Sequence, residues 1–353
     1  MKAILRIFTS VLFAVVVGGA ISFGLDIDPK IPMGGLMIAS LIPGQTGVMV
    51  MAIQKEIWAD HIVGNLFKNN EFLNYAFNAD QYVLQGKVVH IPQAGAAPGV
   101  EKNRSSLPAT VNKRTDVDIT YALDEFTSDP VLIPNADNME LSYDKRESVL
   151  AETQAGIRQL VADWVLYNWS TTISAQIVRT TGTSGVTAHA PSATGNRKEV
   201  LVADIKNMAK VMDKNNVPME DRYLLLDADM YDQLTDNLGV TQYRDFSKAY
   251  DEKKGIVGEL YGFKVMKRSS VLYYTAALAV RTPGHAGAAT DQAAALAWQK
   301  NAVERALGTV DFFEKLGDPL YFGDVYSALV RMGGRKRRND NKGVVALIQA
   351  AAS

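Results

Sequence analysis

Apolar and polar residues follow two different periods along the chain. From Val117 to Asp124 they alternate strictly, which predicts a half-exposed strand. Residues 82–84 and 87–92 also have an extended pattern. Through residues 145–170 the apolar positions instead recur at helical spacing, as Ile157, Leu160, Val161, Trp164 and Val165. This pattern predicts one long helix that begins near Lys145 and ends near Ser170.

Residues 93–114 connect two of the extended runs and are rich in Ala, Gly, Pro, Ser, Lys and Arg. A structureless loop of this length is unusual inside a compact domain and usually functional. We therefore predict a long two-stranded arm that projects from the body. A short amphipathic helix over residues 52–69 is expected to precede it.

An alternating α/β unit is predicted after the glycine-rich loop 180–196, which has the composition of a flexible boundary. The apolar spacing over 201–212 predicts a helix, and residues 223–226 are typical of a short buried strand. Asp227 can cap the next helix, which Gly239 is expected to close.

More strands are expected toward the C-terminal part of the chain. They are predicted within 255–267, at 276–281 and at 293–298, the last two on either side of the loop 282–292. The segment 309–348 is expected to be rich in strands, with an interruption at 333–340. No internal repeat is visible.

Residues 1–50 form a separate module by composition. An uncharged apolar run from Ile7 to Leu25 follows Lys2 and Arg6, which is the profile of a signal peptide or a single membrane-spanning helix. Three interpretations stay open: a targeting or membrane segment, a removable or buried leader of an assembling protein, and an upstream start codon with translation beginning at Met49 or Met51.

Composition excludes several classes of protein. The 353 residues include 37 Lys+Arg and 38 Asp+Glu, a balance that argues against a dedicated polyanion binder. Hydrophobic residues make up 47% of the chain, enough to bury a core, so disorder is excluded. Because there are 0 cysteines, disulfides, thiolate nucleophiles, zinc knuckles and iron–sulfur clusters are excluded as well.

Sequence motifs for catalysis are lacking. None of the four histidines, His61, His90, His189 and His285, has a partner at metal-ligand spacing, and no phosphate-loop, dinucleotide-binding or nucleophile-elbow motif occurs. Asp227 and Asp229 are interpreted as a helix cap and a solvated neighbour rather than as metal ligands. We predict no catalytic residue, no metal and no cofactor.

The order of elements resembles that of the major capsid proteins of tailed bacteriophages, the Hong Kong 97-type fold. Three passages also look like that family: residues 258–265, with the pattern G-x-L-x-G-hydrophobic-x-V, residues 223–227 before a short helix, and residues 315–324 near the end. The resemblance covers about residues 51–350 and rests on the order of these passages, since short glycine patterns recur by chance.

The resemblance implies an α+β fold with an N-terminal arm, an extended hairpin (the E-loop), a peripheral (P) domain with a long spine helix, and an α/β axial (A) domain. The implied boundaries follow the chain: leader or extension 1–50, N-arm 51–80, E-loop 81–123, P-domain 124–197 with the spine helix 145–170, A-domain 198–292, and return to P-domain strands 293–353.

The function implied by the resemblance is that of a structural coat protein, not an enzyme. Its copies would form an icosahedral shell of pentamers and hexamers around double-stranded DNA, assembled in the host cytoplasm as the capsid of a virion. The implied partners are other copies, a scaffolding protein, a portal, minor capsid proteins and packaged DNA held by nonspecific contact. Membrane contact through residues 7–25 stays open.

Charge suggests which residues join neighbouring subunits. The predicted tip of the arm is basic and the approach to the long helix is acidic, so we predict that one subunit's tip lies over another's helix. The alternative is that the two charged faces are solvated independently. The basic residues are Lys102, Arg104, Lys113 and Arg114, and the acidic residues are Asp137, Glu140, Asp144, Glu147 and Glu152. A basic turn that faces DNA or an interface is predicted at Arg335, Lys336, Arg337 and Arg338.

Other functions were weighed against this one. A membrane-anchored or exported bacterial α/β binding protein is supported by residues 1–25 alone and leaves the predicted arm unexplained. An encapsulin-like nanocompartment shell would share the capsid fold and differ in its cargo. An enzyme is the weakest alternative, because no catalytic constellation is present.

Overall fold

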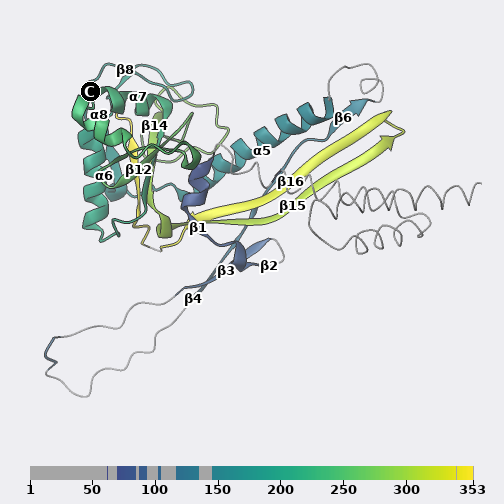
Figure 1. The fold of residues 1–353 in the computed structure, drawn as a ribbon, viewed down its shortest axis with the longest axis horizontal. Coiled ribbons are helices and arrows are strands. Elements are labelled where there is room, and N and C mark those ends of the chain that lie inside the picture. Colours follow the sequence, from purple (N-terminus) through teal and green to yellow (C-terminus); the bar gives the residue numbers. More distant parts are fainter. Residues whose placement is uncertain are drawn as a thin grey trace, which may run out of the picture. The chain divides into compact units, whose positions relative to one another are not determined.

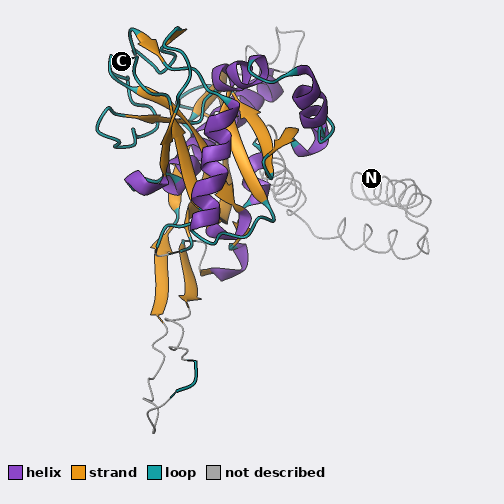
Figure 2. Ribbon diagram, turned by 90° about the vertical axis from the view of Figure 1, so that its left-hand side faces the viewer, coloured by secondary structure: helices purple, strands orange, loops and turns teal. Residues whose placement is uncertain are grey.

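The structure is a computed structural model. It describes residues 62, 70–84, 87–93, 102–104, 117–134, 145–338 and 340–352. All of them belong to the second of the two units into which the chain divides, residues 62–353. The predictions for residues 1–50, and for the helix 52–69 apart from Ile62, lie outside the described residues. The described strands form four sheets, which Figures 1 and 2 show together with the helices.

A five-stranded sheet is built around one long hairpin. Strands β15 (Val303–Asp318) and β16 (Gly323–Lys336) pair in antiparallel fashion along most of their length. Strand β1 (Phe77–Asn78) lies parallel to β15, whereas β5 (Asp124–Thr127) and β6 (Val131–Pro134) pair with β16. Helix α5 (Lys145–Trp169) contacts β16 and runs beside the hairpin (Figure 1).

Helix α5 occupies the segment that its apolar spacing predicted. One face, carrying Ile157, Val161, Val165 and Trp169, is buried. Leu160 belongs to the same predicted stripe but is 42% exposed, because it lies at the edge of that face, beside a groove. The sheet therefore covers a narrower face of the helix than the sequence suggests.

The second large sheet has seven strands, in the order β11-β12-β10-β14-β17-β7, with β13 also paired to β14. Strands β10 and β12 are parallel, β14 is antiparallel to both β10 and β17, and β17 is parallel to β7. The strands are β7 (Ile177–Arg179), β10 (Arg222–Asp227), β11 (Ile256–Leu260), β12 (Phe263–Arg268), β13 (Leu272–Tyr274), β14 (Gln292–Gln299) and β17 (Val344–Ile348).

Three helices contribute to the core on one face of this sheet. They are α6 (Val202–Lys214), α7 (Ala228–Asp236) and α8 (Val240–Ser247). Their buried side chains, such as Ile205, Met230 and Phe246, share a core cluster with alternate residues of β10 and β14. The predicted cap is confirmed, since the Asp227 carboxylate accepts the Met230 backbone N–H at 2.7 Å.

An aromatic cluster joins the two large sheets. The rings of Trp169 at the end of α5 and Trp298 on β14 lie 5.5 Å apart, and Phe72 packs edge-on against both. The indole of Trp298 donates to the Tyr75 carbonyl at 2.9 Å, and the indole of Trp169 donates to the Glu304 carbonyl at 3.0 Å. The segment around Phe72 is thereby fastened to both sheets.

The described part of the predicted arm is a three-stranded sheet. Strand β3 (Val88–Gln93) lies between β2 (Val83–Leu84) and β4 (Val117–Ala122), and both neighbours are antiparallel to it. The period-two pattern at 117–122 is thus confirmed as a strand. The described residues also include five short 3-10 helices: Glu71–Tyr75, Asp80–Tyr82, Ser174–Gln176, Glu252–Lys254 and Lys300–Ala302.

Three predicted features differ from the structure. The loop 180–196 carries a small hairpin, β8 (Val186–Thr187) with β9 (Asn196–Arg197). The strand predicted at 276–281 is wrong, because residues 275–278 turn back and Val280 forms only an isolated bridge with Tyr274. The interruption predicted at 333–340 begins too early, because β16 continues to Lys336.

The long return segment predicted at 293–353 is divided between the two large sheets. Strands β15 and β16 belong to the five-stranded sheet, but β14 and β17 are inner strands of the seven-stranded sheet. Every residue of both inner strands is buried, as expected for strands covered on two faces.

Candidate assembly surfaces

The residues predicted at the tip of the arm and along the long helix are only partly described. Lys102 and Arg104 are exposed in the described piece of the arm, and Glu152 is exposed on α5. Glu147 lies in α5, and its side chain is not described. Neither Lys102 nor Glu152 has an ion-pair partner within the described residues. The remaining predicted contact residues lie outside the described residues: Lys113, Arg114, Asp137, Glu140 and Asp144.

A groove between α5 and β5 has an apolar floor and an acidic rim. Leu160 and Trp164 of the helix line one side, and Phe126 lies in the strand opposite. Asp124 supplies negative charge, and Glu125 beside it pairs with Arg331 at 2.8 Å. Such a surface fits an extended segment that carries both basic and apolar residues.

The other side of the same helix borders a second, polar groove. Glu152, Gly156 and Gln159 of α5 face Lys267 and Arg268 of β12 across it. A Cβ atom added at Gly156 would meet nothing within 4 Å, so no contact within the described subunit requires glycine there. Glycine inside a helix costs about 1 kcal/mol relative to alanine. The outer face of α5 is therefore open enough for another backbone to approach closely.

The tip of the β15–β16 hairpin displays bulky apolar side chains. Leu320 is 78% exposed, Tyr321 58% and Phe322 77%. The turn is well formed, because the Asp318 carbonyl and carboxylate accept the backbone N–H groups of Phe322 and Leu320 at 2.8 and 2.9 Å. Phe322 has a positive φ of 50°, which is costly for a bulky residue. Sequence reasoning missed this surface, although an apolar triplet directly after Gly317-Asp318-Pro319 was the available signal.

The predicted basic turn is mostly engaged inside the subunit. The Arg335 and Arg337 guanidinium nitrogens lie 2.6 and 3.3 Å from the carboxylate of Glu304, which is fully buried. Lys336 donates to the Ser170 carbonyl, and burial lowers the pKa of its amine. Arg338 pairs with Asp340 at 2.8 Å. A DNA phosphate at this turn would have to compete with these partners.

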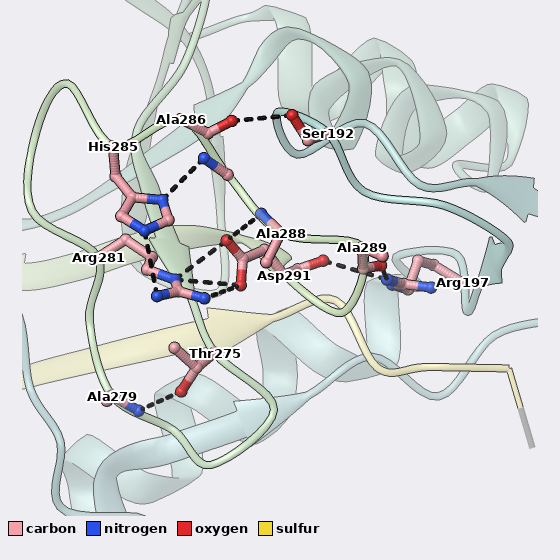
Figure 3. Close-up of polar contacts among 11 residues, drawn as sticks. Ser192, Arg197, Thr275, Ala279, Arg281, His285, Ala286, Ala288, Ala289 and Asp291 are labelled. Carbon is pink, nitrogen blue, oxygen red and sulfur yellow. Dashed lines mark hydrogen bonds and ion pairs between the residues drawn. The ribbon is translucent and has the colours of Figure 1, made fainter.

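A loop at the edge of the seven-stranded sheet is held by a dense set of polar contacts (Figure 3). Arg281 donates to both oxygens of Asp291, and that carboxylate also accepts the Ala288 N–H at 2.9 Å. From the neighbouring hairpin region, Ser192 donates to the Ala286 carbonyl at 2.8 Å and Arg197 donates to the Asp291 carbonyl at 3.1 Å. The loop 282–291 is therefore preorganised.

His189 and Asp227 form the one pair in the described part of the chain that could be taken for a catalytic or metal group. Their Nε2 and Oδ2 atoms lie 2.8 Å apart, and Asp229 is close enough to contribute a third ligand atom. Burial opposes charging of the imidazole, but the hydrogen bond and charge of Asp227, with help from Asp229, raise the pKa of His189. Because Asp227 already caps α7, we interpret the pair as structural.

Several solved phage capsids have a fold similar to that of this chain. The solved capsid of Ralstonia phage GP4 is similar to this chain with a TM-score of 0.57 and 14% identity, over 79% of this chain and 88% of that one. The Cyanophage Pam1 capsid gives a TM-score of 0.56 and 10% identity, over 81% and 93%. The capsid of Cyanophage P-SCSP1u gives a TM-score of 0.54 and 19% identity, over 79% and 87%. The fold is thus the α+β, Hong Kong 97-type fold of phage capsids.

The sequence agrees with the fold. Residues 79–314, more than half of the chain, match the family described as phage capsid protein, and the chain belongs to this family. No curated protein sequence matches it. The protein is a structural coat protein of a bacteriophage capsid, as the resemblance implied, and the binding-protein, nanocompartment and enzyme alternatives are not favoured. Among the described residues no helix is long and apolar enough to span a membrane.

Proposed function

We propose that copies of this chain form the hexamers and pentamers of an icosahedral shell that encloses double-stranded DNA, without catalysing a reaction. The family match over residues 79–314 supports this proposal, because it includes the arm, α5 and all strands of the seven-stranded sheet except β17. We assign residues 51–80 to the N-arm, 81–123 to the E-loop and 124–197 to the P-domain. The A-domain comprises residues 198–292 together with β14 and β17, whose pairing in the seven-stranded sheet supports this placement.

The contact that we propose between neighbours joins the arm of one subunit to α5 of the next. The arm carries the exposed basic residues Lys102 and Arg104, and Lys113 and Arg114 follow in the sequence. Asp124 and the apolar side chain of Leu160 border the groove on one side of α5, whereas Glu152 and the space beside Gly156 border the groove on its other side. Charge complementarity thus favours the groove beside β5, where an acidic residue and an apolar floor lie together.

Such a contact suits a shell because an extended arm buries surface on a neighbour without setting the angle between compact bodies. Pentamers and hexamers require slightly different angles of the same subunit. Each exposed ion pair contributes only about 0–1 kcal/mol. Repetition around the shell makes the sum large, while the individual pairs mainly set register.

Charge exchange tests the contact. Changing Lys102, Arg104, Lys113 and Arg114 together to Glu should abolish shells in sedimentation and electron microscopy, while the subunit still unfolds at the parent denaturant concentration. Adding Asp124→Lys and Glu152→Lys to that same chain should restore shells, because the ion pairs form again with reversed signs. Lys206→Glu with Lys210→Glu on α6 is the matched control and should assemble normally. Normal shells from the reversed arm alone would contradict the proposal.

The other proposed partners follow from the assignment of this chain as a coat protein. We propose assembly in the host cytoplasm, with a scaffolding protein, a portal and minor capsid proteins as further partners. Packaged DNA is proposed to make only weak, nonspecific contacts, because the formal net charge is −1 and the arginines of the basic turn have acidic partners. Measured on intact shells, the release of DNA should therefore depend little on Arg338→Gln.

A further inference from the structure

A buried carboxylate lies where the arm meets the five-stranded sheet. Glu304 on β15 is fully buried, faces Arg335 directly across the β15–β16 ladder, and pairs with it at 2.6 Å. Arg337 approaches its other oxygen at 3.3 Å. A carboxylate in such a place is stable only with cationic partners, and removing one side of the pair leaves an uncompensated buried charge. The two arginines are thus held in fixed positions.

Each of these arginines also packs against an aromatic ring from a different element. The Arg335 guanidinium lies 5.2 Å from the ring centre of Tyr121, which belongs to β4 of the arm. The Arg337 guanidinium lies 3.7 Å from the ring centre of Phe77 on β1. Stacking of a cation on a ring is attractive and depends on the planar shape of the arginine group. The ion pairs of Glu304 therefore extend to the arm through Tyr121.

Tyr121 is enclosed by its surroundings at the base of the arm. Its hydroxyl is buried, and burial, followed by the negative charge of Glu304, raises its pKa, so the phenol stays neutral. Close packing supports the ring. A Cβ atom at Gly333 of β16 would lie 2.9 Å from the Leu123 side chain and 3.4 Å from the Tyr121 ring. Leu123, Val89 and Ala306 form a small core at this point.

We propose that Glu304, Arg335 and Arg337 are positioning residues that set the direction of the arm relative to the five-stranded sheet. The importance of that direction rests on the proposed function of the arm in reaching a neighbour. Strand β3, Val88–Gln93, is roughly 17 Å long at a rise of about 3.3 Å per residue. A rotation of about 10° at the base would move the far end of this strand by about 3 Å. A fixed base therefore directs the arm toward one binding face.

The cysteine-free sequence permits a direct test with spin labels. Lys102→Cys in the arm and Lys206→Cys on α6 are labelled in the full chain, and the distance between the labels is measured in unassembled subunits. The parent should give one narrow distribution. Glu304→Gln should at least double its width, because the charge that holds both arginines is lost. Arg335→Lys keeps the charge and loses the stacking over Tyr121, so it should widen the distance distribution less than Glu304→Gln does. This variant replaces Glu304→Gln in the test if Glu304→Gln does not fold.

The matched control is Asp340→Asn, which breaks the exposed ion pair with Arg338 that lies after the same strand. It should leave the distribution at the parent width. A broad distribution in the parent, or an unchanged width in both Glu304→Gln and Arg335→Lys, would overturn the proposal. The distance between the two labels is measured within one unassembled chain, so its outcome does not depend on whether the arm binds a neighbour. Failure of the charge-exchange experiment would therefore count against the proposed function alone.

Discussion

Two glycines show how single residues control packing in the coat protein. Gly334 on β16 lies against the end of α5, where a Cβ atom would come within 2.9 Å of the Glu304 carbonyl oxygen and 3.0 Å of the Trp169 indole nitrogen. Both neighbours are held in place, since that indole donates to that carbonyl. Gly156 is the opposite case, because beyond the backbone of its own helix no described atom lies within 4 Å of the added Cβ.

The two glycines should therefore respond differently to alanine. Gly334→Ala is expected to destabilise the subunit by about 1–3 kcal/mol, because the close packing at this position must shift. Gly156→Ala is expected to stabilise it by about 1 kcal/mol, because alanine is the better helix residue and meets no neighbour. Denaturant unfolding of the isolated subunits measures both values. Equal effects of the two substitutions would contradict this account of the packing.

The His189–Asp227 pair makes stability depend on pH. The pKa of His189 is raised in the folded protein, so its stabilising effect is fully present below the unfolded value of about 6.5. The effect is lost as the pH rises through the folded pKa. We expect the stability difference between the parent and His189→Gln to be largest near pH 6 and to shrink toward pH 8.

Denaturant unfolding at several pH values measures this difference. Asp227→Asn removes the negative charge and should abolish most of the pH dependence, although it also weakens the cap of α7. A stability difference that grows with rising pH would mean that the pair does not favour the charged imidazole.

At the scale of elements, the tip of the β15–β16 hairpin is a well-formed turn that exposes three apolar side chains in succession. Three successive bulky side chains at Leu320–Phe322 gain nothing from the subunit itself, because they face solvent. Large exposed apolar patches in soluble proteins usually mark interaction surfaces. In a coat protein the natural partner is another copy.

Serine at all three positions should therefore prevent or weaken assembly and leave subunit stability within about 0.5 kcal/mol of the parent. Sedimentation velocity with electron microscopy measures assembly, and denaturant unfolding measures stability. The conservative triple variant Leu320→Met, Tyr321→Phe and Phe322→Tyr keeps the apolar surface and should still form shells. Normal shells from the serine variant would show that the tip is not an interface.

The elements also show how far the sequence alone predicts the fold. Strand β4 and helices α5 and α6 have a clear period in the sequence, and the described parts of the two helices have one buried and one exposed face. Helix α8 was missed, since Val240 and Tyr243 point outward and only Phe246 is buried, which leaves no apolar stripe. The predicted strand at 276–281 has strand-like composition but no partner beyond one bridge.

Pairing between distant segments has no local signal. The sequences of β14 and β17 do not indicate whether these strands pair in the sheet of β10 or in that of β16. A fully buried strand is a continuous apolar run, and such a run carries no information about its partner. The candidate sites show the same limit. Charge revealed the basic and acidic segments, but the engagement of Arg335 and Arg337 by Glu304 depends on the register of β15 and β16.

On the scale of the whole molecule, the features are those of a subunit made to assemble. The chain belongs to the phage capsid protein family, and its described surface carries an arm base, an open helix face and an apolar hairpin tip. The polar clusters at Asp291 and Glu304 hold a loop and the base of the arm.

Cryo-electron microscopy of the sedimenting material from cells that express the full chain, beside the chain begun at Met51, tests the central claim most directly. We predict closed shells of megadalton mass in which the β3–β4 arm of one subunit crosses α5 of a neighbour. Protein that stays monomeric in both forms at every concentration would contradict the account, as would shells in which the arm contacts only its own subunit.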